Sequence, residues 1–270
     1  MKDQILVYPI EYKSRRDIIK IKPLMDLHLG SKSCDLKAFK EFIKDRDENT
    51  YFYTNGDLWD AIYFSDKRFK AGIQDNPIDD APIDEEIKEM VKMLAPIQDR
   101  IICIGHGNHE ETIVKRNHTN MSKRLAEALN VPYLGYSFWF RLHIFHDTGR
   151  VRKVDFFSTH GFGGGTRTEG GSITKYSKFG DRFDADIIVC GHDHRKQFVR
   201  YPIMSIIGEK EVRLIAKPKM VCLGGSWKKA YLTDACTTWE ETKGFTASEI
   251  GGITIEIKVR DNGVGLNVSM

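Results

Sequence analysis

The sequence has 270 residues, of which 41% are hydrophobic and 29% are charged, with a formal net charge of +3. These proportions are ordinary for a soluble globular protein, and the length allows one large buried core. No apolar run reaches the roughly 20 residues of a membrane helix, and the N-terminus lacks an apolar signal segment, so we expect no membrane partner. The small net charge does not by itself indicate a polyanionic partner.

Apolar runs of strand length alternate with helical patterns in the first half of the chain, whereas the second half is rich in strands. The first half therefore predicts βαβ units, and the second half predicts a further sheet packed on the first. We expect one α/β domain over residues 1–270. In chain order, the predicted elements are a strand over Ile18–Met25, a helix capped by Asp35, a strand over Tyr51–Thr54, a helix over Ile83–Leu94 that ends at Pro96, a strand over Ile101–Ile104, a helix over Met121–Leu129, and strands over Phe138–Phe145, Val154–Thr159, Ile187–Cys190 and Val212–Leu223.

The five cysteines are odd in number and form no CxxC pair. Cys103 and Cys190 lie within apolar runs, which is typical of small buried side chains rather than of disulfide partners. Unpaired cysteines predict a reducing compartment, so we expect a cytoplasmic protein.

Polar residues of a metal-binding kind follow the predicted strands. Ligands at the carboxyl ends of strands converge on one crevice in an open α/β sheet, so residues far apart in the sequence can form one site. Residues at i and i+2 of an extended segment point to the same side, which suits Asp-x-His and His-x-His pairs. The segments are Asp26-x-His28, Gly56-Asp57-x-x-Asp60, Gly107-Asn108-His109-Glu110, His160-Gly161 and Gly191-His192-x-His194.

The donor types predict a site for divalent cations. Carboxylates, imidazoles and an amide oxygen favour manganese, with iron, zinc, nickel and magnesium as alternatives. No cysteine belongs to the set, which argues against a structural zinc site. Each segment alone is typical of a surface turn, and only their combination at successive strand ends predicts a metal centre.

The pattern DxH, GDxxD, GNHE, H and GHxH resembles the calcineurin-like metallophosphoesterase superfamily, over Asp26 to His194. The resemblance implies a four-layer α/β/β/α sandwich of two mixed sheets flanked by helices. It implies that Asp57 bridges two metal ions. It also implies one ion on Asp26, His28 and His194, and the other on Asn108, His160 and His192.

The same resemblance implies a mechanism. Two ions about 3.5–4 Å apart would share a hydroxide that attacks a phosphate ester in line. His109 is expected to protonate the leaving group, and Asp60 is expected to orient His109. The chain is therefore predicted to be a metal-dependent phosphoesterase, a hydrolase.

The motifs also favour one subgroup. Protein serine/threonine phosphatases show GDxVDRG and GNHExR. Here Ala61-Ile62 follows Asp60 and Glu111-Thr112 follows Glu110, so the arginines of that subgroup are missing at those positions. Gly-Asp-Leu-Trp-Asp is similar to the GDLFD block of SbcD-type nucleases, and the compact length is similar to small virus-encoded phosphoesterases. We expect a phosphodiester of a nucleotide or nucleic acid as substrate. The alternatives are a phosphomonoesterase or protein phosphatase, and a non-catalytic metal-bound scaffold.

The glycine-rich stretch Gly161–Gly171 lacks the spacing of a nucleotide-binding loop, and alone it is typical of a surface loop. It directly follows His160, a predicted ligand. Arg167 within it and Lys175 after it are predicted to bind the substrate phosphate in place of the missing arginines.

Overall fold

The structure is a computed structural model that describes residues 5–14, 16–63, 82–146, 149–164, 166, 168–209, 211–231, 237–260 and 263–270. Its helices are α1 (Leu36–Lys44), α2 (Pro82–Leu94), the short 3₁₀ helix η1 (Ala95–Arg100), α3 (Asn108–Asn117), α4 (Met121–Ala128), α5 (Glu169–Arg182) and α6 (Trp239–Lys243). Its strands are β1 (Ile5–Glu11), β2 (Ile18–Leu24), β3 (Thr50–Thr54), β4 (Ile104–Gly105), β5 (Tyr133–Gly135), β6 (Ser137–Phe145), β7 (Val151–Thr159), β8 (Ile187–Cys190), β9 (Lys196–Ile207), β10 (Arg213–Ser226), β11 (Gly251–Gly252), β12 (Thr254–Arg260) and β13 (Gly263–Ser269).

Two mixed sheets form the centre of the fold. The seven-stranded sheet has the order β1-β6-β7-β8-β10-β11, with β9 paired to β10. The four-stranded sheet has the order β13-β12-β2-β3. Strands β7, β8 and β10 run parallel, as do β2 and β3, so in each sheet these strands end at the same edge.

The two sheets pack face to face through aromatic and branched side chains. Phe140 of β6 stacks on Phe156 of β7 with ring centroids 4.5 Å apart, and Tyr53 of β3 meets Phe140 from the other sheet at 5.2 Å. All three side chains are essentially inaccessible to solvent. Burial of such rings removes a large apolar area from water, so this layer holds the two sheets together.

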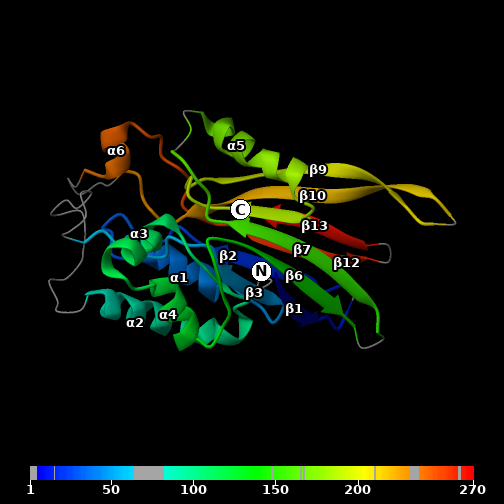
Figure 1. Ribbon diagram of the computed structural model, residues 1–270, viewed down its shortest axis with the longest axis horizontal. Coiled ribbons are helices and arrows are strands. Elements are labelled where there is room, and N and C mark those ends of the chain that lie inside the picture. The colour runs from blue at the N-terminus through cyan, green and yellow to red at the C-terminus, as the bar shows by residue number, and fades with distance from the viewer. Residues whose placement is uncertain are drawn as a thin grey trace.

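Helices cover the outer face of each sheet (Figure 1). Helices α1 to α4 contribute Phe39, Met90 and Leu125 to the apolar layer over β2 and β3. Helix α5 contributes Tyr176 to a separate layer over β7, β8 and β10. The predicted four-layer α/β/β/α arrangement is confirmed.

Local sequence explains where the first helix begins. The Asp35 carboxylate accepts the backbone N–H of Ala38 at 3.0 Å, which satisfies one of the free donors at the start of α1. Phe39 and Ile43, four residues apart, then face the sheet and are buried. The predicted helix cap at Asp35 is confirmed.

Three predictions of element boundaries were wrong. Within the predicted strand Ile101–Ile104, only Ile104 belongs to an assigned strand, β4, and Ile101 forms an isolated parallel bridge with Phe52 of β3. The sheets also do not divide at the middle of the chain: β1 joins the sheet of the second half, and β12 pairs with β2 of the first. The stretch Gly161–Gly171 is not a loop throughout, since α5 begins at Glu169.

No helix within the described ranges is long and apolar enough to cross a membrane.

Candidate metal centre

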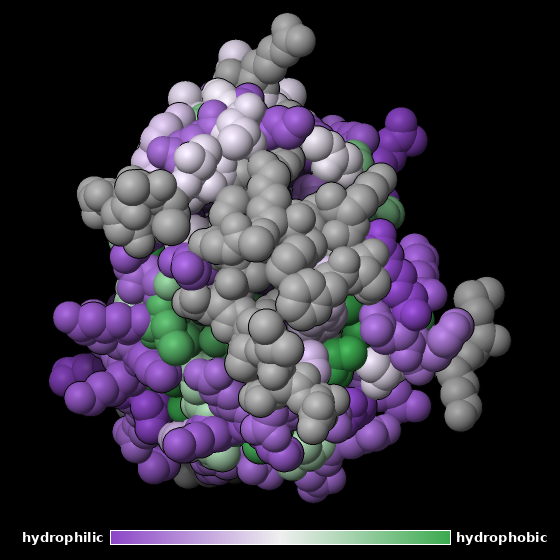
Figure 2. All heavy atoms as spheres, turned by 90° about the vertical axis from the view of Figure 1, so that its left-hand side faces the viewer, coloured by the Kyte–Doolittle hydropathy of each residue, from purple (hydrophilic) through white to green (hydrophobic). Residues whose placement is uncertain are grey.

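Five predicted site segments lie at strand ends in the structure. Asp26 follows β2, Asp57 follows β3, Asn108 follows β4 and opens α3, His160 directly follows β7, and His192 follows β8. The edge where they meet lies beside α3 and α6, at the left of Figure 1, and faces the viewer in Figure 2. Apart from the grey residues, this face is mainly hydrophilic, with apolar surface in small separate patches (Figure 2).

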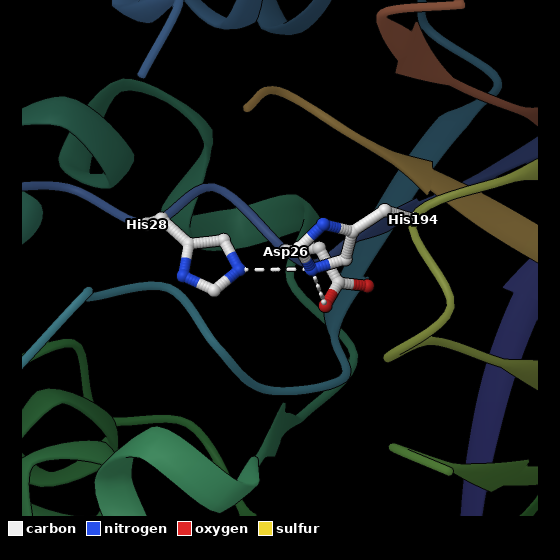
Figure 3. Close-up of side chains that lie close together, drawn as sticks. All are labelled: Asp26, His28 and His194. Carbon is white, nitrogen blue, oxygen red and sulfur yellow. Dashed lines mark hydrogen bonds and ion pairs between the residues drawn. The ribbon is translucent and has the colours of Figure 1, made fainter. Parts of the chain in front are cut away.

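Three predicted ligands form the first cluster, shown in Figure 3. His28 Nε2 lies 3.0 Å from His194 Nε2, and His194 Nε2 lies 3.4 Å from Asp26 Oδ1. Ligand atoms that each lie about 2.1 Å from a shared ion are separated by roughly 3.0–3.5 Å at ordinary coordination angles. The three side chains therefore have the spacing that a common cation requires.

The second cluster contains the other four predicted ligands. His160 Nε2 lies 3.1 Å from Asp57 Oδ2 and 3.0 Å from Asn108 Oδ1. His192 Nδ1 lies 2.7 Å from the same Asn108 oxygen. The two clusters adjoin, since the Asp26 carboxylate accepts the backbone N–H of His192 at 3.0 Å. All seven residues predicted to bind metal are thus brought together.

Two of the histidines are oriented by backbone carbonyl groups. His160 Nδ1 lies 2.9 Å from the carbonyl oxygen of Asn55, and His192 Nε2 lies 2.5 Å from that of Gly163. A carbonyl oxygen can only accept a hydrogen bond, so each of these nitrogens carries the proton. The other nitrogen of each ring then directs its lone pair into the cluster, which is the usual orientation of a metal-binding histidine.

The Asp60 carboxylate lies closer to His28 than to His109, the histidine that it is predicted to orient. Asp60 Oδ1 lies 3.0 Å from His28 Nδ1 but 3.8 Å from His109 Nδ1. His109 Nδ1 instead donates to the backbone carbonyl of Asp60. The carboxylate keeps the proton of His28 on Nδ1 and leaves the Nε2 lone pair for a metal.

This geometry changes what the Asp60→Asn variant should do. Carboxylates that orient metal-binding histidines typically contribute about 10–100-fold to metal affinity. We expect Asp60→Asn to weaken metal binding by about that factor, measured by metal titration of the purified protein. Unchanged metal affinity, with slower turnover only of substrates that have poor leaving groups, would show that the Asp60 carboxylate orients His109.

Several of the predicted ligands have unusual backbone conformations. Of the eight non-glycine residues with positive φ in the described part of the chain, five are predicted ligands. Only a few per cent of such residues adopt positive φ, and backbone strain of this kind concentrates at functional sites. The five residues are Asp26 (49°), His28 (55°), Asp57 (49°), His192 (73°) and His194 (54°).

Glu110 is a site residue that the sequence analysis did not assign. Its carboxylate is buried and accepts the backbone N–H groups of Asp57 at 3.0 Å, Leu58 at 2.8 Å and Gly107 at 2.9 Å. It thereby joins the loop that carries Asp57 to the start of α3. A glutamate three residues after the N-cap is a known signature of helix capping, so the spacing of Gly107 and Glu110 could have indicated this role.

The same two loops approach each other at glycines. A Cβ atom on Gly56, whose φ is +91°, would lie 2.3 Å from the backbone nitrogen of Gly107. Any side chain there would push the loops apart. The glycines therefore allow Asp57 and Asn108 to reach the same cluster.

The charges of the site favour cation binding. Asp26, Asp57 and Asp60 are each at most 1% exposed. Burial opposes ionisation, yet the protonated form of the facing His160 ring holds the pKa of Asp57 well below its usual range. Burial lowers the pKa of His160, but Asp57 outweighs it and raises that pKa to about 10, so a metal that binds this ring nitrogen has to displace a proton. Burial also lowers the pKa of His28 to about 4, so this ring is neutral at pH 7. Ionised carboxylates and a neutral imidazole are the forms that bind metals, and buried carboxylates are stabilised by a nearby cation.

His109 belongs to neither predicted ligand set, but with His28 and Asp60 it forms a third group whose possible ligand atoms lie within 4.8 Å of one another. Its backbone N–H donates to Asp57 Oδ1 at 2.9 Å, and its Nε2 lies 4.0 Å from Asp57 Oδ2. Because Nδ1 bonds to the Asp60 carbonyl, Nε2 is the nitrogen nearer the clusters. This position suits transfer of a proton to a group held there.

Lys175 has a different place from the one predicted. Its Nζ lies 2.5 Å from Asp193 Oδ1 and 3.0 Å from the carbonyl oxygen of Phe162. It therefore ties the glycine-rich loop to the turn between His192 and His194, and its charge is matched by Asp193. Arg167 lies outside the described residues.

Comparisons with known proteins give likeness in three-dimensional structure only. No protein-family model matches the sequence, and no curated protein matches it. The calcineurin-like phosphoesterase YfkN from Bacillus subtilis is 12% identical, over 93% of this chain and 90% of that chain, with a TM-score of 0.43. A metallophosphoesterase from Sphaerobacter thermophilus is 14% identical, over 93% and 88%, with a TM-score of 0.37. A protein serine/threonine phosphatase from Saccharomyces cerevisiae is 13% identical, over 98% and 83%, with a TM-score of 0.38.

These structures come from the family that the motifs resemble. At such identities, and with TM-scores below 0.5, activity has to be inferred from the chain's own site.

Proposed function

We propose that the chain is a two-metal phosphoesterase. The observation that carries the proposal is the convergence of seven donor side chains, from five separate strand ends, into two adjoining clusters with metal-ligand spacing. Four ring nitrogens and three oxygens meet there, with groups behind them that orient several of the rings, and chance proximity of surface turns does not explain such an arrangement.

The predicted donors divide into two groups, one for each ion. Asp26, His28 and His194 would hold one ion, and Asn108, His160 and His192 the other. Asp57, whose Oδ2 faces His160, would contact both. Two divalent cations held by these residues would supply a nucleophile from water near neutral pH and would neutralise charge on the phosphoryl oxygens. Manganese is the ion that we favour, since oxygen and imidazole donors are mixed.

The remaining residues position and protonate the substrate. His109 is placed to donate a proton to the leaving oxygen through Nε2. Glu110 fixes the backbone of Asp57, and thus the distance between that carboxylate and His109. We favour a phosphodiester of a nucleotide or nucleic acid, as in the nuclease-like subgroup, because the arginines typical of protein phosphatases are missing after Asp60 and Glu110.

Hydrolysis with defined metals tests the proposal. Protein stripped by a chelator should not hydrolyse bis(para-nitrophenyl) phosphate, and added manganese should restore turnover. Metal that binds only the folded chain should also raise the midpoint of thermal unfolding. Bound metal without hydrolysis of this diester or of para-nitrophenyl phosphate would favour a scaffold. Faster hydrolysis of the monoester would favour a phosphomonoesterase.

A further inference from the structure

A cavity of about 430 Å³ begins at the predicted ligands and continues past them. His28, Asp57 and His192 line one end, and Lys228, Glu240 and Phe245 line the other. Cavities of a few hundred cubic ångströms typically enclose small organic ligands, and a phosphate alone would fill only part of this space. The end away from the ligands therefore has room for the organic part of an ester.

Glu240 presents an unused acceptor in this cavity. The residue is 8% exposed, and its Oε1 lies 3.2 Å from Lys228 Nζ. Its Oε2 is buried and has no hydrogen-bond partner among the residues that the structure describes. Buried polar atoms are nearly always hydrogen-bonded, so an exception within a cavity indicates a partner that arrives with a ligand. An ionised carboxylate only accepts, so that partner must be a donor.

Lys228 connects this acceptor to the metal end of the cavity. Its Nζ lies 3.9 Å from Asp60 Oδ1 as well as 3.2 Å from Glu240. Its backbone N–H donates to Ser226 Oγ at 3.1 Å, which anchors it at the end of β10. The ammonium group thus lies between the Glu240 carboxylate and the Asp60 carboxylate beside the predicted ligands.

The walls of the same end are partly apolar. Phe245 is half-buried and, together with Ile62 and Ala230, lines the cavity. A partly apolar wall with an unpaired carboxylate oxygen beside it suits a flat ring system that carries a hydroxyl or amino group. The ester of a simple alkyl alcohol has no donor left in its alkyl group and would leave this acceptor unpaired.

We propose that Glu240, Lys228 and Phe245 form a subsite for the nucleoside part of a phosphate ester, with a hydroxyl or amino donor of the nucleoside bound to Glu240 Oε2. This inference rests on the proposed function, because the phosphate of the ester would lie at the metal end. With this subsite, a small nucleotide ester should be a better substrate than an aryl ester of similar reactivity.

Two chromogenic esters test the subsite. The para-nitrophenyl ester of thymidine phosphate carries a nucleoside with donors, whereas bis(para-nitrophenyl) phosphate carries none. Hydrogen bonds to a charged acceptor strongly discriminate between such substrates. In manganese-loaded protein, Glu240→Gln and Glu240→Ala should lower kcat/KM for the thymidine ester at least tenfold, and change that for the diaryl ester less than threefold.

Glu249→Gln is the matched control. Glu249 belongs to the same part of the chain and pairs with Lys196 at 2.6 Å, but its side chain is 75% exposed and does not line the cavity. Glu249→Gln should leave kcat/KM for both esters unchanged. An equal loss on both esters in the Glu240 variants, or a loss on neither, would overturn the subsite.

Direct binding separates the subsite from the hydrolysis. Calorimetric titration of the metal-loaded wild type should show binding of adenosine, at least tenfold weaker binding of dideoxyadenosine or of nebularine, and no such preference in Glu240→Ala. The first analogue lacks the 2′- and 3′-hydroxyls of the sugar and the second lacks the base amino group, so the analogue that binds more weakly identifies the donor. If neither ester is hydrolysed, the proposed function fails while this titration still decides the subsite. Equal binding of all three nucleosides to the wild type would overturn it.

Discussion

Asp57→Asn is expected to lower kcat/KM for bis(para-nitrophenyl) phosphate by about 10³-fold or more, and to leave fewer than two ions per chain. The Asp57 carboxylate is buried and faces His160 at 3.1 Å, where it would contact both ions. Asparagine keeps the shape but removes the charge that opposes two divalent cations. Metal catalysis contributes several kcal/mol to the barrier, and each 1.36 kcal/mol corresponds to a factor of ten in rate.

Metal analysis and steady-state kinetics together check this expectation. His28→Gln removes a ligand from one cluster only, so it should cost less metal and less activity than Asp57→Asn. Asp45→Asn is a control for loss of a carboxylate, because Asp45 pairs with Lys22 and its side chain is 89% exposed. Two tightly bound ions and normal turnover in Asp57→Asn would show that this residue does not bridge.

The convergence of the site could be predicted from the sequence because it depends on local rules. A strand followed by a polar residue places that residue at the edge of a sheet, and parallel neighbours share an edge. Residues Asp26 and Asp57 follow β2 and β3, which are paired in parallel. Residues His160 and His192 follow β7 and β8, which are also parallel. The motifs therefore indicated both which side chains meet and where they meet.

Contacts between distant segments could not be predicted in the same way. The Asp60 carboxylate lies within reach of both His28 and His109, and a difference of 0.8 Å between 3.0 and 3.8 Å decides which histidine it orients. Lys175 lies near the site in sequence, but the distance to Asp193 that determines its role depends on how α5 packs over β8. Neither of these two contacts produces a periodic pattern in the sequence from which it could be predicted.

The far end of the cavity had no sequence signal either. Lys228 follows β10, and Glu240 lies in the short helix α6, so neither belongs to a strand-end motif. The two residues are separate in the sequence and meet only in the folded chain. Strand β12, which follows α6, pairs with β2, so the segment between β10 and β12 spans from one sheet to the other.

His109→Ala is expected to retain both ions and to slow hydrolysis of alkyl phosphate esters by about 10²–10⁴-fold, the usual contribution of a positioned general acid. The His109 ring contacts the Asp60 carbonyl through Nδ1, and its Nε2 is 4.0 Å from Asp57 Oδ2. Removal of the ring deletes a proton donor beside the clusters but no predicted ligand. Alkoxide leaving groups need that proton, whereas para-nitrophenolate is stable without it.

A series of phosphate esters with leaving groups of increasing pKa measures this effect. The loss of kcat in His109→Ala should grow along the series, and it should be small for para-nitrophenyl esters. His143→Ala, on β6 and outside every motif, is the control for removal of an imidazole. Metal content has to match the wild type, because loss of an ion would slow every ester in the series. An equal loss along the whole series, with both ions retained, would show that His109 stabilises charge on the phosphoryl oxygens and does not protonate the leaving group.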